Sequence, residues 1–270
     1  MVVLSARQRL TSPPGTGHLA SRWTLPISVG HYWSHLVGAQ TEVAEDTVIN
    51  VLTEGGYALE HGSGRLRTHP GRGVFVRRGV PFATRPVPCP RRGVYLRLHP
   101  SVWEELHGVV GGSPDVRSLP LPPGPLVALH RMARVAAGLP EDAFVEAGFA
   151  LAEHLLRDAP PVAAREDPAV AHVLNDLTLD PGSRATQDER AAAVGMTRFQ
   201  LARRFRLQTG TTLFQTQESI RMGIALERVR RGQDLTELAL SLGYSSHAHF
   251  TERFRRHFGG PPSRVRARIR

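Results

Sequence analysis

The chain has 270 residues, enough for one large domain or two small ones that each bury a core. It carries 34 basic and 24 acidic residues, a net charge of +10, and one cysteine. A single cysteine excludes an intramolecular disulfide framework and a cysteine-rich zinc module. No stretch reaches the ~18 apolar residues of a membrane span. We therefore expect a cytoplasmic protein that spans no membrane and needs no cofactor.

The positive charge is concentrated in the C-terminal third. From residue 187 onward there are 16 Arg and 7 acidic residues, a net of +9, whereas the preceding residues hold 18 Arg and 17 acidic residues, a net of +1. Every basic residue is Arg, whose planar guanidinium suits bidentate contacts with phosphate and guanine. This distribution predicts a polyanionic partner for the C-terminal part.

The N-terminal half is predicted to be rich in strands. Residues 1–20 contain Thr-Ser-Pro-Pro-Gly-Thr-Gly and are expected to form a flexible arm. Short β-rich segments then alternate with glycine-containing turns, at residues 48–52, 57–60, 65–68, 74–77, 82–85 and 94–98. Many short strands at close spacing are typical of a small antiparallel barrel or sandwich.

Helical periodicity begins after a Pro- and Gly-rich connection at residues 114–125. One predicted helix is marked by Leu126, Leu129 and Ala133, and the next by Phe144, Gly148, Leu151 and Leu155. The second set forms one narrow apolar stripe, which packs either on the barrel or against a second copy in a homodimer. We place a sensor or dimerisation domain at residues 21–158, a Pro-containing linker at 159–167 and an all-helical domain at 168–270.

The helical domain contains an internal repeat. Residues 189–210 align with residues 237–259, and Gly195 and Phe205 of the first copy correspond to Gly243 and Phe254 of the second. A short helix, a glycine-containing turn and a basic helix, present twice, predict two helix-turn-helix units in tandem. Helix starts are indicated by capping residues at Thr186, Thr197, Asp234 and Ser246.

The second helix of each unit is expected to bury one face and expose the other. Leu201 and Phe205 share the buried face in the first copy, as do Phe250, Phe254 and Phe258 in the second. The opposite faces carry the residues that we expect to meet DNA. They are Arg198, Phe199, Ala202, Arg203 and Arg206 in the first unit, and His247, Ala248, Thr251, Glu252 and Arg255 in the second.

The last hundred residues resemble the DNA-binding domain of the AraC/XylS family of bacterial transcription regulators. The resemblance rests on Met196-Thr-Arg-Phe-Gln-Leu-Ala-Arg-Arg-Phe-Arg, on a long linker helix with Arg221 and Ala225, and on Leu238-Ala-x-x-x-Gly-Tyr-Ser-Ser-His-Ala-His-Phe through Arg266. It implies that the base-reading residues are Phe199, Ala202 and Arg203, then His247, Ala248, Thr251 and Glu252. Glu252 departs from the family pattern, which usually has Arg there, so we expect the second unit to bind less tightly or to read a cytosine.

The resemblance extends weakly into the N-terminal half. Residues 66–82, from Leu-Arg-Thr-His-Pro-Gly to Gly-Val-Pro-Phe, are similar to the cupin-type turn of AraC sensor barrels. The implied fold class is α+β, with an N-terminal cupin-like antiparallel β-barrel and helical hairpin, followed by two helix-turn-helix units joined by a long helix. Phe82 stands where the family usually has His, and the N-terminal half contains no His-x-His pair, which argues against a metal-binding cupin enzyme.

The resulting prediction is a sequence-specific transcription regulator and not an enzyme, with activator and repressor both left open. Its expected partners are double-stranded DNA in the nucleoid, a small-molecule effector, a second copy of the chain and, for an activator, RNA polymerase. Trp33, Tyr57 and His69 are candidate effector contacts, although buried aromatic residues of a barrel are commonly plain core. Two alternatives stay open: an effector-independent regulator whose N-terminal domain only dimerises, and a cupin-type enzyme fused to a DNA anchor.

Overall fold

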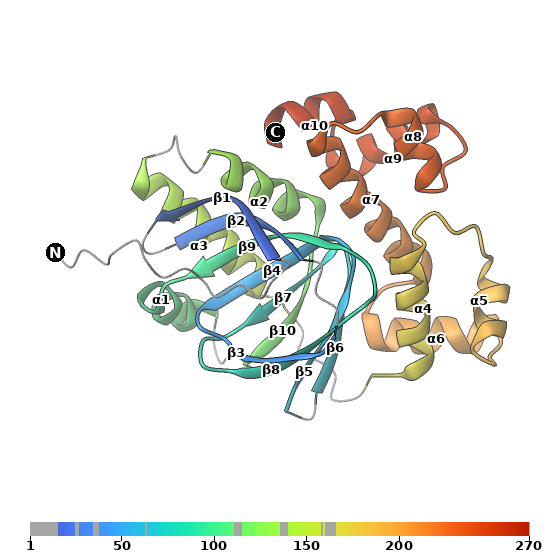
Figure 1. Cartoon of the computed structure of the whole chain (residues 1–270), viewed down its shortest axis with the longest axis horizontal. Coiled ribbons are helices and arrows are strands. Elements are labelled where there is room, and N and C mark those ends of the chain that lie inside the picture. The colour runs from blue at the N-terminus through green and yellow to red at the C-terminus, as the bar shows by residue number, and fades with distance from the viewer. Residues whose placement is uncertain are drawn as a thin grey trace.

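The structure is a computed structural model that describes residues 16–24, 27–34, 38–62, 64–110, 115–135, 140–157, 159 and 166–269. Two antiparallel sheets form the N-terminal part, and the C-terminal part is entirely helical (Figure 1). The predicted α+β class is confirmed. We call the two sheets together the barrel.

Within the described residues the barrel has ten strands in two sheets, and all neighbouring strands are antiparallel. The six-stranded sheet has the order β1 (Thr16–Thr24), β2 (Ile27–Ser34), β9 (Arg91–Leu98), β4 (Thr47–Glu54), β7 (Arg72–Val76) and β10 (Val116–Pro120). The four-stranded sheet has the order β3 (Gln40–Val43), β8 (Pro81–Pro86), β5 (Tyr57–His61) and β6 (Gly64–Thr68).

Strand alternation gives the six-stranded sheet two buried faces. On β7, Val74 and Val76 belong to an apolar cluster shared with the four-stranded sheet, while Phe75 between them packs into the larger core with the helices. Successive side chains of a strand point to opposite faces, so one strand serves both cores. The sheet is therefore a middle layer between the barrel interior and the helices.

All six predicted strands are confirmed within two or three residues, and four more are present. The expectation of a flexible arm is wrong for residues 16–20, since they belong to β1, which pairs with the edge of β2. The sequence does not show that this edge is open for pairing. Residues 116–120, within the expected connection, form β10 on the edge of β7. Residues 1–15 lie outside the described part.

Three helices follow the barrel strands: α1 (Pro100–Val110), α2 (Pro123–Val135) and α3 (Glu141–Arg157). The predicted apolar stripe of α3 is buried inside the chain, in the same core as the sheet and α2. A Cβ added to Gly148 would lie 2.9 Å from Ile27 Cδ1, so α3 approaches β2 closely. The stripe already has its partner, and it no longer supports a homodimer.

Seven helices form the C-terminal part. The first helix-turn-helix unit contains α4 (Pro168–Leu179), α5 (Gln187–Ala193) and α6 (Arg198–Thr209). The long helix α7 (Leu213–Arg231) leads to the second unit, with α8 (Leu235–Ser241), α9 (His247–Phe258) and α10 (Pro262–Ile269). The two predicted units and the long joining helix are confirmed.

The barrel contacts the C-terminal helices directly, mainly through α7. The β6–β7 turn lies on α7 so closely that a Cβ added to Gly223 would be 2.9 Å from Pro70 Cβ. On β4, Glu54 accepts a hydrogen bond from Arg228 Nε at 2.7 Å. Arg67 on β6 donates to Glu166, at the end of the predicted linker, over 2.8 Å. Residues 160–165 of that linker lie outside the described part.

Candidate nucleic-acid interface

Helix α6 is a firmly bounded helix with one buried and one exposed face. Thr197 caps its start, as predicted, and forms a reciprocal capping box with Gln200. The helix ends at Gly210, whose φ of 74° suits a residue without a side chain. Leu201 and Phe205 are fully buried and fix the helix to its unit. The opposite face is left free.

Helix α9 repeats this construction in the second unit. Ser246 accepts a hydrogen bond from the His249 backbone amide at 3.1 Å, and Gly259 ends the helix with a φ of 72°. Phe250 and Phe254 are fully buried. The N-cap of α9 is therefore as predicted, and so are two of the three residues expected on its buried face, since Phe258 is half-buried.

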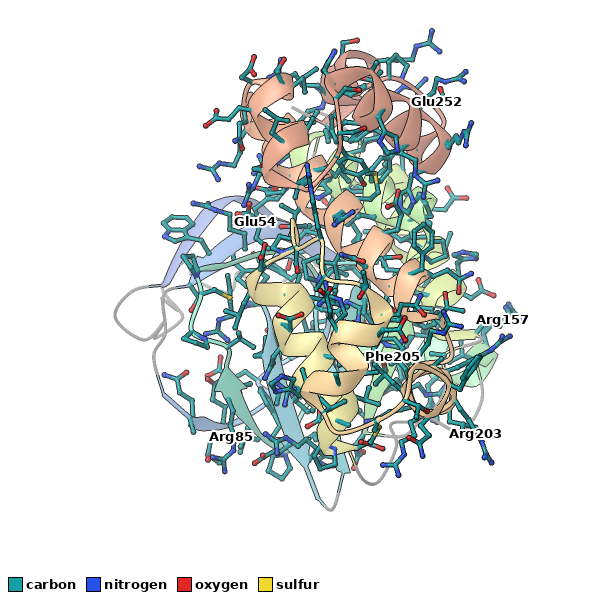
Figure 2. All side chains as sticks on the ribbon, turned by 90° about the vertical axis from the view of Figure 1, so that its right-hand side faces the viewer. Glu54, Arg85, Arg157, Arg203, Phe205 and Glu252 are labelled. Atoms are coloured by element: carbon teal, nitrogen blue, oxygen red, sulfur yellow. The ribbon has the colours of Figure 1, made fainter. Side chains whose placement is uncertain are left out.

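The predicted DNA-contacting residues lie on the outer faces of α6 and α9. Phe199 is 73% exposed, a high value for a large apolar side chain. In Figure 2, Arg203 of α6 and Glu252 of α9 both lie on the right-hand side of the view, near the bottom and the top. Thr251 and Glu252 are half-buried, and the other predicted residues are exposed. The exposed residues are Arg198, Phe199, Ala202, Arg203, Arg206, His247, Ala248 and Arg255.

The arginines of the two helices differ in their availability. Arg203 and Arg206 form no ion pair with any residue that the structure describes. Arg198 lies over the Phe199 ring at 4.8 Å and 3.9 Å from a carboxylate oxygen of Asp188. The first unit thus presents guanidinium groups that are free to meet an external acceptor.

In the second unit, Glu252 occupies the neighbouring arginines. Its carboxylate accepts hydrogen bonds from Arg255 Nε at 3.0 Å and Arg256 Nε at 2.8 Å. These bonds from Arg255 and Arg256 lower the pKa of Glu252. The sequence showed that the carboxylate of Glu252 is unusual at this position. The ion pairs were not predicted, although Arg255 and Arg256 follow Glu252 at i+3 and i+4, the spacing at which side chains of a helix meet. The two units present different charge patterns.

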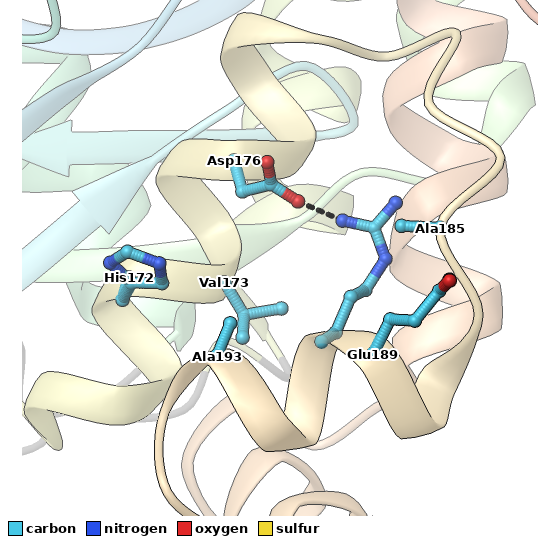
Figure 3. Close-up of a pocket in the computed structure, with 7 residues that line it drawn as sticks. His172, Val173, Asp176, Ala185, Glu189 and Ala193 are labelled. Atoms are coloured by element: carbon cyan, nitrogen blue, oxygen red, sulfur yellow. Dashed lines mark hydrogen bonds and ion pairs between the residues drawn. The ribbon is translucent and has the colours of Figure 1, made fainter.

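A small pocket in the first unit is lined by α4 and α5. Its volume is about 160 Å³, and Arg190, one of the residues that line it, donates a hydrogen bond to Asp176, drawn as the dashed line at Asp176 in Figure 3. The Arg190 side chain is 3% exposed, and the Glu189 carboxylate beside it is held by the Thr186 cap. These polar groups tie the two helices together. We regard the pocket as part of the scaffold of the first unit.

The three candidate effector contacts fall in different places. Tyr57 is buried in the barrel interior, below the guanidinium of Arg91, whose carbon lies 5.6 Å from the ring centre. Trp33 is half-buried on β2. His69 is buried in the β6–β7 turn, where it bonds to Pro70 O at 2.8 Å, and burial lowers its pKa to about 4.

The barrel interior contains polar residues that sequence reasoning missed. Tyr32 donates a hydrogen bond to Asn50 Oδ1 at 2.7 Å, and Arg91 donates to Ser34 Oγ at 3.1 Å. Arg91 is only 6% exposed and has no carboxylate partner among the described residues. Alternation along β2 and β9 was the available signal, but neither β2 nor the start of β9 was predicted as a strand.

Among the described residues, no group of three or more His, Cys, Asp or Glu side chains is placed to hold a metal ion. The histidines at positions 61, 69 and 99 bond to different partners, namely Pro81 O, Pro70 O and Ser101 Oγ. In the same part of the chain, none of the helices has the length and apolar character needed to cross a membrane.

Comparison with known proteins finds similarity in the C-terminal part of the chain. Residues 190–268 match the family model described as "Helix-turn-helix domain". The HTH-type transcriptional regulator MtrA of Neisseria gonorrhoeae is 29% identical over 102 residues, which cover 37% of this chain and 34% of that protein. The RCS-specific HTH-type transcriptional activator RclR of Escherichia coli (strain K12) is 31% identical over 104 residues, covering 38% and 37%. The chain thus matches about a third of the length of these relatives.

Solved structures are similar as well. ToxT from Vibrio cholerae O395 is 11% identical with a TM-score of 0.39, covering 91% of this chain and 98% of that chain. An AraC-type regulator from Chromobacterium violaceum is 25% identical with a TM-score of 0.35, covering 38% and 92%. The matched family model and the two relatives confirm the predicted resemblance of the C-terminal part to the helix-turn-helix domains of AraC-type transcriptional regulators.

Proposed function

We propose that this protein is a sequence-specific DNA-binding transcription regulator. The proposal rests on two capped helices, α6 and α9, each with an exposed face. A single long helix, α7, joins the two units to which they belong. A helix is about 10–12 Å across, and the major groove of B-DNA is about 12 Å wide. Each helix therefore suits one segment of major groove, and the net charge of +9 from residue 187 onward favours a phosphate backbone.

The residues divide by the contact that each can make. Arg203 on α6 is the best candidate for base reading, since a guanidinium binds guanine O6 and N7 in a bidentate manner. Arg206 lies one turn further along α6, and we assign it to a phosphate. In the second unit, Ala248 and Thr251 offer small contacts, while Glu252 and Arg255 bind each other. The two units should read different bases, so the site for one monomer is asymmetric.

The experiment is a binding measurement on the full chain. Selection from random duplex DNA would first define a preferred site, and Kd would then be measured for that site and for scrambled DNA at several salt concentrations. We expect a preference for the selected site and a steep loss of affinity with salt through counterion release. Arg203→Ala should weaken discrimination, and Arg206→Ala should weaken both affinities equally. Equal affinity for selected and scrambled DNA would refute the proposal.

We further propose that a small molecule in the barrel controls DNA binding. The support is the buried Arg91 above Tyr57. Its Nη2 donates to Ser34, but its Nε has no hydrogen-bond acceptor among the described residues, and a buried guanidinium with an unmet donor is costly. An effector with an anionic group would supply that acceptor. Its effect would reach α7 through the β6–β7 turn, which lies directly on Gly223.

A thermal-shift screen of small carboxylates against the full chain tests this control. A ligand that binds only the folded protein raises its melting temperature. The shift should disappear in Arg91→Met and persist in Arg85→Met, which changes an exposed arginine of the four-stranded sheet. The same ligand should change the Kd for DNA. A DNA affinity that no such ligand alters would favour an effector-independent regulator.

We also propose that the protein activates transcription in the cytoplasm. The matched relative RclR is named an activator, and its similarity lies in the DNA-binding part. Activation would require a contact with RNA polymerase, and a homodimer would allow two asymmetric sites to be read together. A promoter-reporter strain with and without the gene would show whether expression rises, and light scattering of the purified protein would give its oligomeric state.

A further inference from the structure

The two helix-turn-helix units touch each other directly, in addition to being joined by α7. The turn between α4 and α5 lies against the turn between α8 and α9. A Cβ added to Gly182 would lie 2.5 Å from Ser241 O, and one added to Gly243 would lie 2.4 Å from Gly182 O. The two backbones approach so closely that only glycine fits at either position. The units thus meet at a fixed point.

Arg221 on α7 holds both turns at this point. Its Nε donates to Pro181 O at 2.7 Å and its Nη2 donates to Ser183 O at 3.1 Å, both in the first unit. The guanidinium carbon lies 5.6 Å from the ring centre of Tyr244, at the turn of the second unit. Charge-assisted hydrogen bonds and a cation–π contact from one side chain therefore connect three elements.

Glu218, nearly one turn earlier on α7, holds the second unit from the same side. It accepts hydrogen bonds from Arg253 Nε at 2.8 Å and from the Tyr244 hydroxyl at 3.3 Å. The side chain of Glu218 is 15% exposed and that of Arg253 is 28% exposed, so this ion pair is shielded from solvent. Arg253 belongs to α9 itself, which makes the contact act directly on the predicted recognition helix.

We propose that Glu218, Arg221, Tyr244 and Arg253, which we call the inter-unit clamp, determine the spacing between the two DNA segments that the protein accepts. The proposal rests on the proposed DNA-binding function. One extra base pair moves the second segment by about 3.4 Å and rotates it by roughly 35°. A clamped pair of helices cannot follow this change, whereas a pair joined by α7 alone can. The clamp is therefore a specificity device that touches no base.

The test compares spacer lengths in a selected DNA site. With the full chain, Kd is measured for the selected site and for versions with one or two base pairs inserted or deleted between its halves. The wild type should lose about 5- to 150-fold in affinity per step, the usual penalty for one wrong base pair. Glu218→Ala should bind the original site more weakly but lose clearly less with each insertion. Arg203→Ala should bind every version more weakly and keep the wild-type penalty.

A second measurement reads the clamp without DNA. Spin labels at Leu207→Cys and Ala248→Cys, in a Cys89→Ser background, report the distance between α6 and α9. The distance distribution should be narrow in the wild type and broader in Glu218→Ala. If Glu218→Ala fails to fold, Tyr244→Phe takes its place, because it loses one hydroxyl and keeps its ring. Its distance distribution should be broader than that of the wild type and narrower than that expected without the clamp.

The outcomes separate this proposal from the proposed function. Unchanged spacer penalties and a narrow distribution in both clamp variants would overturn the clamp while leaving DNA binding intact. A wild-type chain that selects no DNA site would overturn the proposed function. The proposed role in spacing would then be refuted as well, even if Glu218→Ala still broadened the distance distribution.

Discussion

Glu54 of β4 and Arg228 of α7 join the barrel to the helix that carries both helix-turn-helix units, with 2.7 Å between Arg228 Nε and Glu54 Oε1. A β-bulge between Leu52 and Glu54 makes this contact possible. Leu52 belongs to the interior cluster of the barrel, and without the bulge Glu54 would face the same way. The bulge turns Glu54 toward α7. Figure 2 shows Glu54 at this junction.

Replacing Glu54 should loosen the barrel from α7. Its carboxylate, 15% exposed, also lies within 3.3 Å of Arg92 and 4.0 Å of Arg231, so Glu54→Ala leaves three guanidinium groups without their acceptor. We expect a loss of about 1–3 kcal/mol in the free energy of unfolding and faster amide exchange in α7. Glu60→Ala removes an exposed ion pair with Arg85 and should cost under about 1 kcal/mol. Equal effects in both variants would contradict a special role for Glu54.

Gly223→Ala tests the packing of the β6–β7 turn on α7. Within a helix, alanine is favoured over glycine by about 1 kcal/mol. Here the new Cβ would lie 2.9 Å from Pro70 Cβ and 3.3 Å from the Gly71 backbone nitrogen, so the turn must move. We expect the full chain to gain no stability and the amides of residues 71 and 72 to exchange faster. Gly108→Ala, where a Cβ meets nothing within 4 Å, is the control that should stabilise its helix. A stabilised Gly223→Ala variant with unchanged exchange would show that the turn is not held there.

Features that repeat along the chain could be predicted from the sequence. The strands from 48 to 98, the α3 stripe and the caps at Thr197 and Ser246 each follow from spacing or from a local hydrogen-bonding pattern. Leu201 and Phe205 were predictable because a helix must bury one face. The same periodicity left the outer face of α6, with Arg203, exposed.

Contacts between distant segments could not be predicted in this way. The bulge that redirects Glu54 adds one residue to a strand and leaves no clear pattern in the sequence. The close approach of Gly182 to Gly243 depends on how two units pack, and glycine at either position also suits an isolated turn. The position of Arg91 above Tyr57 depends on which strands are neighbours. The order of the strands and the packing of the helices determine these contacts. The secondary-structure propensity of each segment does not show which distant segments become neighbours.

The buried histidine pair predicts how stability depends on pH. His31 on β2 and His130 on α2 are joined by a 2.9 Å hydrogen bond between ring nitrogens, and burial lowers the pKa of each to about 3. In the unfolded chain both would titrate near 6.5. Between about pH 6.5 and 3 the unfolded state binds more protons, so stability is complete above pH 6.5 and is lost as the pH falls.

Chemical denaturation at several pH values measures this effect. Each of the two histidines should contribute a slope of up to about 1.4 kcal/mol per pH unit within that window. His130→Phe should flatten the curve, whereas His154→Phe, on the exposed side of α3, should leave it unchanged. A wild-type free energy of unfolding that stays constant from pH 7 to 5 would contradict the depressed pKa values.

Glu252→Ala should strengthen binding to DNA of any sequence. In the free protein the carboxylate accepts hydrogen bonds from Arg255 and Arg256, and a negative charge beside DNA repels phosphate. Its removal releases two guanidinium groups on α9, so the dependence of log K on log salt should become steeper by about one unit for each new phosphate contact. Glu252→Gln keeps the size of the side chain and serves as the matched variant. If both variants lose affinity specifically for sites with a cytosine at one position, Glu252 reads that base, because the carboxylate accepts from cytosine N4. An unchanged affinity and salt slope in both would remove Glu252 and its two arginines from the DNA interface.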